Sequence, residues 1–336
     1  MSEFSIITKI NKTFPNTDLK LVKSIGDDCA IIDRGNFFEI ITTDMYVEED
    51  HFSLKWSNPK QIGIKAFEAS ISDIAAMGGM PKYLLVSLCI SKKMNEEDFI
   101  SDFYKGFKSR MNFWNKFFKK PPIPSLIGGD LTHGDLICVN VTVIGEVERN
   151  KCIKRSGAKT GDLICVTGNL GGSWAGLEYL RKNEKLKMKN EEFGFQKFCI
   201  NENLEPHCRL DAGLILKNYV SSMIDISDGL ASEVRHICEQ SKVGAIVYKS
   251  KIPLSKEVIA MGKFLNKDPY QWALSGGEDF ELCYTISKIN YKKLSNLKSF
   301  KHSSHIVGEI LPKSKGLHLI DFNGKKLPMP KGYEHF

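Results

Sequence analysis

The stretch MIDISDGLASE, residues 223–233, carries the pattern from which the fold is best read. Its first residues are apolar except for Asp225, which is typical of a buried strand, and a helix-like run follows Gly229. Asp225 and Asp228 therefore lie where a strand ends and a helix begins, with Ser227 between them. This position suits a metal-bound phosphate. Aspartate and glycine also mark ordinary turns, so the motif alone leaves both interpretations open.

Length and composition indicate an ordinary globular protein of about two domains. The chain has 336 residues, of which 42% are hydrophobic and 26% are charged. The net charge of +7 is spread along the chain. A nucleic-acid-binding protein needs a clustered basic face, so we expect no nucleic-acid partner. The charge is compatible with an anionic small substrate.

The nine cysteines are scattered, and several lie in apolar strand-like runs without any CxxC pair. This usage indicates buried thiols in a reducing compartment. The eight histidines show no HExxH or zinc-finger spacing, which gives little support to a zinc site. No apolar signal core or bilayer-spanning run is visible, so we expect a cytoplasmic protein without membrane contact.

The predicted elements alternate in an order typical of an α/β or α+β protein. In the first half we expect a mixed βαβαβ order, with a helix that starts at Ser57-Asn58-Pro59 and another that Asn95 opens. Near residue 150 the pattern restarts with a strand at 162–168 and a glycine-rich turn at 168–172. Residues 181–203 read as a polar stretch, and Asn323-Gly324 predicts a hairpin. We therefore expect domains at 1–150 and 151–336.

Carboxylates recur at the ends of these elements, mostly beside Gly, Ser or Thr. They are Asp27, Asp28, Asp44, Asp73, Asp130, Asp225 and Asp228. Hard oxygen ligands of this kind suit Mg²⁺, which substrate phosphates usually complete. For Asp73 the alternative is a side chain that points outward from an amphipathic helix. The glycine-rich turn at 168–172 is a plausible phosphate cradle.

Several familiar catalytic motifs are missing. The sequence contains no GxxxxGK[ST] loop, no HRD/DFG set and no GxSxG, and no Cys or Ser is flanked by an obvious base. Carboxylates and glycine loops without a nucleophile favour metal-assisted phosphoryl transfer. We expect no protein nucleophile and no protein base.

Taken together, the motifs resemble the thiamine-monophosphate kinase family over nearly the whole chain. They are GDDCA, TTD, the HF of VEEDHF, SDIAAMGGMPK, GGDLT, RSGAKTGD, TGNLGG, MIDISDGLASE, SGGEDFEL and GYEHF. The superfamily also includes aminoimidazole ribonucleotide synthetase, selenophosphate synthetase and the hydrogenase-maturation dehydratase. The pair GGEDFEL and GYEHF points to the kinase rather than to these relatives.

The resemblance implies a two-domain synthetase-like fold. The N-terminal domain would bind ATP and Mg²⁺ and pair with its twin in a homodimeric β-barrel, and the C-terminal domain would be α/β. The implied reaction is ATP-dependent phosphorylation of thiamine monophosphate to thiamine diphosphate. The alternatives are another ATP-dependent synthetase or dehydratase of the superfamily, and a non-enzymatic nucleotide-binding module.

Site residues follow from the resemblance by position. Magnesium would be held by Asp28, Thr42, Thr43, Asp44, Asp73, Asp130, Asp225 and Asp228. ATP would contact Tyr104, Gly129, Asp130, Arg155 and Ser227. The substrate would contact His51, Phe280 and Tyr333, with the last two packing on the thiamine rings. Without the resemblance, Tyr104 could equally cover a helix face and Arg155 could be a loop cation.

The sequence departs from the family pattern at a few positions. Glu49 and Asp50 stand where the family has Gly and an apolar residue, and we expect these acidic side chains to point away from a phosphate substrate. Ser70 replaces an Asn, and Tyr333 replaces a Trp, which keeps a stacking ring of smaller area. These departures concern the substrate contacts rather than the reaction.

Overall fold

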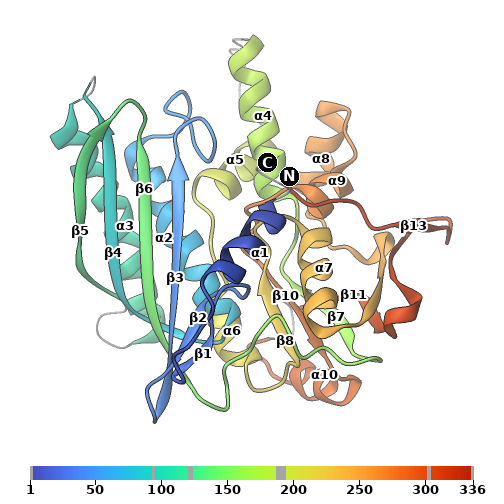
Figure 1. Ribbon diagram of the computed structural model, residues 1–336. Coiled ribbons are helices and arrows are strands. Elements are labelled where there is room, and N and C mark those ends of the chain that lie inside the picture. Colours follow the sequence, from blue (N-terminus) through green and yellow to red (C-terminus); the bar gives the residue numbers. More distant parts are fainter. Residues whose placement is uncertain (1–2, 93–94, 120–123, 187–193, 301–303, 334–336) are drawn as a thin grey trace.

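The computed structural model describes residues 3–92, 95–119, 124–186, 194–300 and 304–333. Two mixed sheets stand side by side, each with its own helices (Figure 1). The predicted two-domain α/β architecture is confirmed. Within the described ranges of this single chain both sheets are open, and no closed barrel forms.

The first sheet has the strand order β1-β2-β3-β6-β4-β5. Its strands are β1 (Leu21–Lys23), β2 (Ala30–Asp33), β3 (Phe37–Val47), β4 (Met80–Ser91), β5 (Ser125–Gly134) and β6 (Cys138–Glu148). β3 and β4 both pair antiparallel with β6, whereas β4 and β5 are parallel. Strand β6 alternates buried and half-exposed residues because only one face meets the core. Edge strand β5 is exposed along almost its whole length.

Helix α2 (Pro59–Ala76) lies between the two sheets and is buried on nearly all sides. Asn58 begins it through a capping box with Gln61, and Pro59 occupies the first turn, as predicted. Glycine allows a close approach to α3 (Glu96–Phe118), because a Cβ at Gly63 would lie 2.1 Å from the Phe103 carbonyl oxygen. On its other side α2 contacts α6 (Leu210–Leu216) and β8 (Ser222–Asp225). One helix is thus shared by both halves.

The second sheet has the order β13-β12-β9-β11-β7-β10-β8. Its other strands are β7 (Leu163–Thr167), β9 (Gly244–Tyr248), β10 (Leu282–Ile286), β11 (Ser304–Leu311), β12 (Leu317–Ile320) and β13 (Lys326–Pro328). Strands β12 and β13 form the predicted hairpin around Asn323-Gly324. The remaining helices are α1 (Glu3–Thr13), α4 (Gly172–Leu186), α5 (Gly194–Leu204), α7 (Leu230–Ser241), α8 (Lys256–Leu265), α9 (Pro269–Ser275) and α10 (Lys288–Ser295).

One hydrophobic cluster runs through both halves. It joins Phe67 and Ile74 of α2 to Met223 of β8 and Tyr284 of β10. All nine cysteines are free thiols, and six of these side chains are buried, as predicted for several of them. In the described ranges no helix is long and apolar enough to cross a bilayer.

Candidate active site

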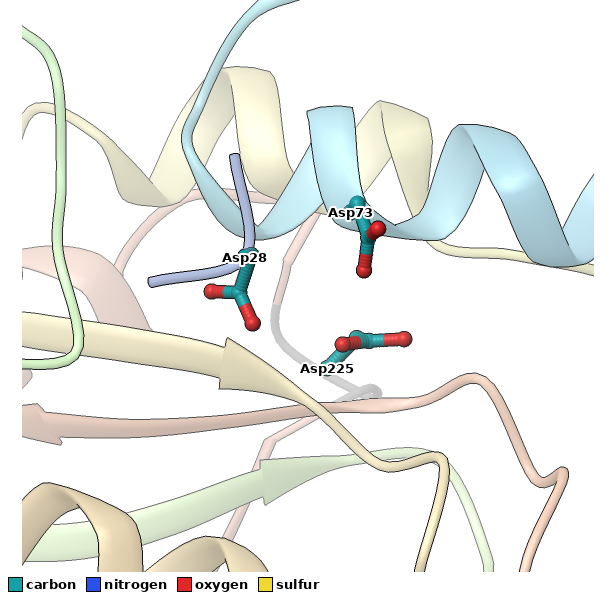
Figure 2. Close-up of side chains that lie close together, drawn as sticks. All are labelled: Asp28, Asp73 and Asp225. Carbon is teal, nitrogen blue, oxygen red and sulfur yellow. The ribbon is translucent and has the colours of Figure 1, made fainter. Parts of the chain in front are cut away.

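Three carboxylates from distant parts of the chain meet beside α2. Asp28 precedes β2, Asp73 lies in the last turn of α2, and Asp225 ends β8. One oxygen of each lies within 4.8 Å of the other two. Figure 2 shows the three side chains converging on one small space. The outward-pointing alternative for Asp73 is wrong, because its carboxylate faces those of Asp28 and Asp225.

The environment of this cluster disfavours negative charge. Burial raises the pKa of Asp28 to about 7 and that of Asp225 to about 6. Burial, followed by the charges of nearby carboxylates, also raises the pKa of Asp73 well above its usual value. Oδ2 of Asp28 is buried and accepts no hydrogen bond. An orphaned carboxylate oxygen beside two more carboxylates is a suitable donor set for a hard divalent cation, so these residues fit magnesium.

Two predicted site residues support the cluster directly. Nε and Nη2 of Arg155 both donate to Oδ1 of Asp28, at 2.9 and 2.6 Å. The Thr42 hydroxyl donates to Oδ2 of Asp73. Arg155 therefore neutralises part of the buried negative charge and fixes the Asp28 carboxylate, whatever else it contacts.

A cavity of about 200 Å³ adjoins the cluster. Two chemical groups make up most of its lining. The acidic group comprises Asp44, Asp50, Asp73, Asp225, Asp228 and Glu278, and the aromatic group comprises Tyr46, His51, Trp174, Phe280 and Tyr333. Such a cavity can accept a ligand with an aromatic, cationic part and a metal-bound anionic part.

The loop before β10 forms part of this wall in a strained conformation. Glu278 and Phe280 have φ of 66° and 49°, in the left-handed region that side chains rarely adopt. Their amides donate to the carbonyl oxygens of Ser227 (2.8 Å) and Ile226 (2.9 Å). The SGGEDFEL and MIDISDGLASE motifs are therefore joined by main-chain hydrogen bonds, which hold the strained loop at the cavity.

The interpretation of the glycine-rich turn at 168–172 as a phosphate cradle is wrong, because a side chain already occupies the amides at its end. Oδ2 of Asp279 accepts from the Gly171 amide at 2.7 Å, and Oδ1 accepts from the Ser173 amide at 3.3 Å. The carboxylate thus caps the N-terminus of α4, where a phosphate would otherwise bind. Burial raises the pKa of Asp279 to about 8.

All three predicted substrate residues line the same cavity. His51, Phe280 and Tyr333 line the cavity, and so do Ser227, Asp228 and Asp44. Burial raises the pKa of Asp44 to about 6, and the nearby Ser70 hydroxyl partly offsets that rise. The last part of the GYEHF motif, residues 334–336, lies outside the described residues.

Four predicted residues lie elsewhere in the described part of the chain. Thr43 points to the face of β3 opposite Thr42 and Asp44, where its hydroxyl lies 3.0 Å from that of Thr142. Gly129 and Asp130 are exposed on edge strand β5. Tyr104 is half-buried on α3, with its ring against Phe103 and Phe107.

The acidic residue Asp50 does not point away as expected, because it lines the cavity. Burial raises the pKa of the Tyr333 hydroxyl, and the charge and hydrogen bonding of Asp50 raise it further. Two positions at which the sequence departs from the family pattern therefore interact with each other.

Sequence reasoning missed Trp174 and Arg181. The Trp174 ring centroid lies 5.6 Å from that of Tyr333, and the Arg181 guanidinium lies 6.0 Å from the Trp174 centroid. The available signal was their spacing of seven residues, which places both on one face of a helix that starts at the TGNLGG motif.

Comparison with known families agrees with this geometry. Residues 26–147 match the model of the N-terminal domain of AIR synthase related proteins, and residues 159–285 match that of the C-terminal domain. The thiamine-monophosphate kinase of Buchnera aphidicola (subsp. Schizaphis graminum) is 38% identical over all of this chain and 99% of its own. That of Bacillus subtilis is 34% identical over the full length of both.

Solved structures give the same result. The complex of AaThiL with AMPPCP and TMP has a TM-score of 0.84 at 32% identity, covering all of this chain and 97% of that one. The hydrogenase maturation protein HypE of E. coli, at 17% identity, has a TM-score of 0.67 and shares the fold. The resemblance drawn from the motifs is thus confirmed, and the chain belongs to the thiamine-monophosphate kinase family.

Proposed function

We propose that this protein transfers the terminal phosphoryl group of ATP to thiamine monophosphate, giving thiamine diphosphate and ADP. The observation that carries the proposal is the cavity in which an acidic cluster and an aromatic lining occur together. The relative AaThiL, with the same fold, is complexed with AMPPCP and TMP. An acceptor with cationic and aromatic rings and a phosphate group matches the two kinds of lining.

We propose Mg²⁺ as the cation of the cluster, held by Asp28, Asp73 and Asp225. Further magnesium ligands proposed from the motifs are Thr42, Asp44 and Asp228, which lie beside this cluster or its cavity, and Thr43 and Asp130, which lie away from it within the chain. When bound, Mg²⁺ supplies positive charge that reduces repulsion between ATP and the acceptor phosphate. The protein contributes the position of these carboxylates, since they come from two sheets and the shared helix.

The acceptor itself explains why no protein base is needed. A phosphate monoester has a second pKa of about 6, so at neutral pH it is largely a dianion with a free nucleophilic oxygen. In the transfer, that oxygen bonds to the terminal phosphorus of ATP as the bond to the ADP oxygen breaks. ADP leaves with the electron pair. The task left to the side chains is in-line orientation.

The aromatic side chains would provide that orientation. Trp174, Phe280 and Tyr333 offer flat surfaces for the rings of thiamine, and His51 lies beside them. For ATP we propose contacts with Tyr104, Gly129 and Asp130 in the first half and with Arg155 and Ser227 near the cluster.

We also propose that the protein is a cytoplasmic homodimer. The exposed edge strand β5 carries Leu126, Ile127 and Leu131, which are large, apolar and open to solvent. Unprotected apolar edges of this kind favour pairing with another copy, and two such sheets would close into the barrel implied by the family. Within each chain we propose the division at 1–150 and 151–336.

The decisive experiment measures ADP release with Mg²⁺-ATP and thiamine monophosphate, alongside free thiamine. We expect turnover with the monophosphate alone, and thiamine diphosphate equal in amount to the ADP. Turnover with free thiamine only, or ADP release without a diphosphate product, would refute the proposal.

A further inference from the structure

Lys65 belongs to the shared helix α2, and its charged side chain is buried in the protein. Its exposed fraction is 5%, and Nζ donates to Oε2 of Glu278 at 2.8 Å and to the carbonyl oxygen of His51 at 3.0 Å. Burying an ammonium group is costly, and a buried ion pair often stabilises a fold no more than an apolar pair would. A contribution to the free energy of unfolding therefore does not explain why a lysine is buried at this position. The two groups that it contacts suggest a role in the cavity instead.

Both partners belong to the cavity wall, and they come from different halves of the chain. His51 follows β3, and Glu278 lies in the strained loop before β10. Buried Asn203 also donates to Oε2 of Glu278, at 3.3 Å. Lys65 therefore ties one wall of the cavity to the other through a single ammonium group.

The position of Lys65 along α2 relates these two walls to the carboxylate cluster. Lys65, Ala69 and Asp73 are spaced by four residues, so they lie on one face of the helix. Ala69 lines the cavity and Asp73 belongs to the cluster. Eight residues of α-helix span about 12 Å. A single rigid element thus sets the distance between the cluster and the point where the two walls are joined.

We propose that Lys65 is a positioning residue for the ring-bearing end of thiamine monophosphate. Its ammonium group holds His51 and Glu278 at a fixed separation, and this separation sets the width of the cavity in which the rings bind. Lys65 acts through these two residues and not by contact with the substrate. The inference rests on the proposed function and adds a determinant of substrate binding to it.

The test compares steady-state constants of wild type and Lys65→Met in the full-length protein. We expect the KM for thiamine monophosphate to rise at least ten-fold, because the wall becomes loose, while the KM for ATP stays within two-fold. Lys82→Met is the matched control. Lys82 is only partly buried and pairs with Glu146 at 3.2 Å, outside the cavity lining, so both constants should be unchanged.

A purely structural role gives a different result. It would lower the thermal stability and the active fraction of the enzyme, and therefore kcat, and it would leave both KM values unchanged. That result would overturn the inference, and so would an equal rise in the KM for ATP and the KM for thiamine monophosphate. If Lys65→Met does not fold, the double variant Glu278→Gln/Lys65→Met, which leaves no carboxylate of this pair without its cation, is compared with wild type, and the same ten-fold rise in the KM for thiamine monophosphate is expected. Wild type without thiamine monophosphate turnover would instead refute the proposed function and the inference together.

Discussion

Replacing Asp225 by Asn should stabilise the metal-free protein and abolish phosphoryl transfer. The oxygens of Asp28, Asp73 and Asp225 lie within 4.8 Å of one another. At an effective dielectric constant of 20, two unit charges at this separation repel by about 3.5 kcal/mol, and asparagine removes two such pairs. Arg155 and partial protonation offset much of this.

The pKa of Asp225 gives a second measure of how much its charge destabilises the metal-free fold. Burial raises it from 3.8 to about 6, and such a shift corresponds to roughly 3 kcal/mol at a pH above both values. The Coulomb repulsion and the pKa shift both indicate that the Asp225 carboxylate destabilises the metal-free fold. We therefore expect the free energy of unfolding of Asp225→Asn to exceed that of wild type by about 3 kcal/mol without metal.

Urea unfolding at pH 7.5 in EDTA, followed by a Mg²⁺ titration, measures the difference in the free energy of unfolding between wild type and Asp225→Asn. Wild type should gain stability with Mg²⁺, and the variant should gain much less. Asp162→Asn is the control, since Asp162 is also buried but accepts hydrogen bonds from the Lys159 amide (3.0 Å) and the Ser221 hydroxyl (2.6 Å). It should lose stability and keep the Mg²⁺ response. The reasoning fails if Asp225→Asn is less stable than wild type in EDTA, or responds to Mg²⁺ as wild type does.

Three further outcomes are expected. Gly63→Ala places a Cβ 2.1 Å from the Phe103 carbonyl oxygen and should cost about 2 kcal/mol or more in urea unfolding, whereas Gly194→Ala, with open space around it, should change little. The raised pKa of Asp279 means that its protonated form stabilises the fold fully below about pH 4 and that this contribution is lost as the pH rises through about 8. Wild type should therefore lose more stability than Asp279→Asn between pH 5 and pH 9, and equal losses in urea unfolding would contradict the assignment. Trp174→Ala should raise the KM for thiamine monophosphate about five-fold, the equivalent of a ring contact of about 1 kcal/mol, with the KM for ATP as the internal control.

Local signals were sufficient for much of the fold. The Asn58 and Asn95 caps fixed the starts of α2 and α3, and Asn323-Gly324 fixed the last hairpin. The stretch 181–203 gave no helix signal beyond its polarity. Arg181, Lys182 and Glu184 of α4 are charged and exposed, α5 shows little separation of apolar and polar faces, and residues 187–193 lie outside the described residues. Strand order lay beyond local patterns, since β4 pairs with β6 and β5 through contacts distant in sequence.

The sequence predicted those site residues that combine a metal-binding side chain with a place at the end of a helix or strand. Carboxylates at element ends pointed to Asp28, Asp73 and Asp225, and the family motifs joined them into one cluster. Lys65 gave no signal, because a lysine in a helix normally faces solvent; only the tertiary packing of α2 buries it. The phosphate cradle failed for a similar reason, since the capping carboxylate of Asp279 comes from more than a hundred residues away.

The single hydrophobic cluster that runs through α2 has a consequence for how the chain folds. Two family models divide the sequence, yet Phe67 and Ile74 pack in the same core as Met223 and Tyr284. Cutting the chain between the models would open that core in both pieces and expose α2 on one side. The two domains that the family models define are therefore not two independent unfolding units, and both halves should unfold in one transition. For the same reason the cavity between them cannot open by a hinge motion without disrupting the shared core.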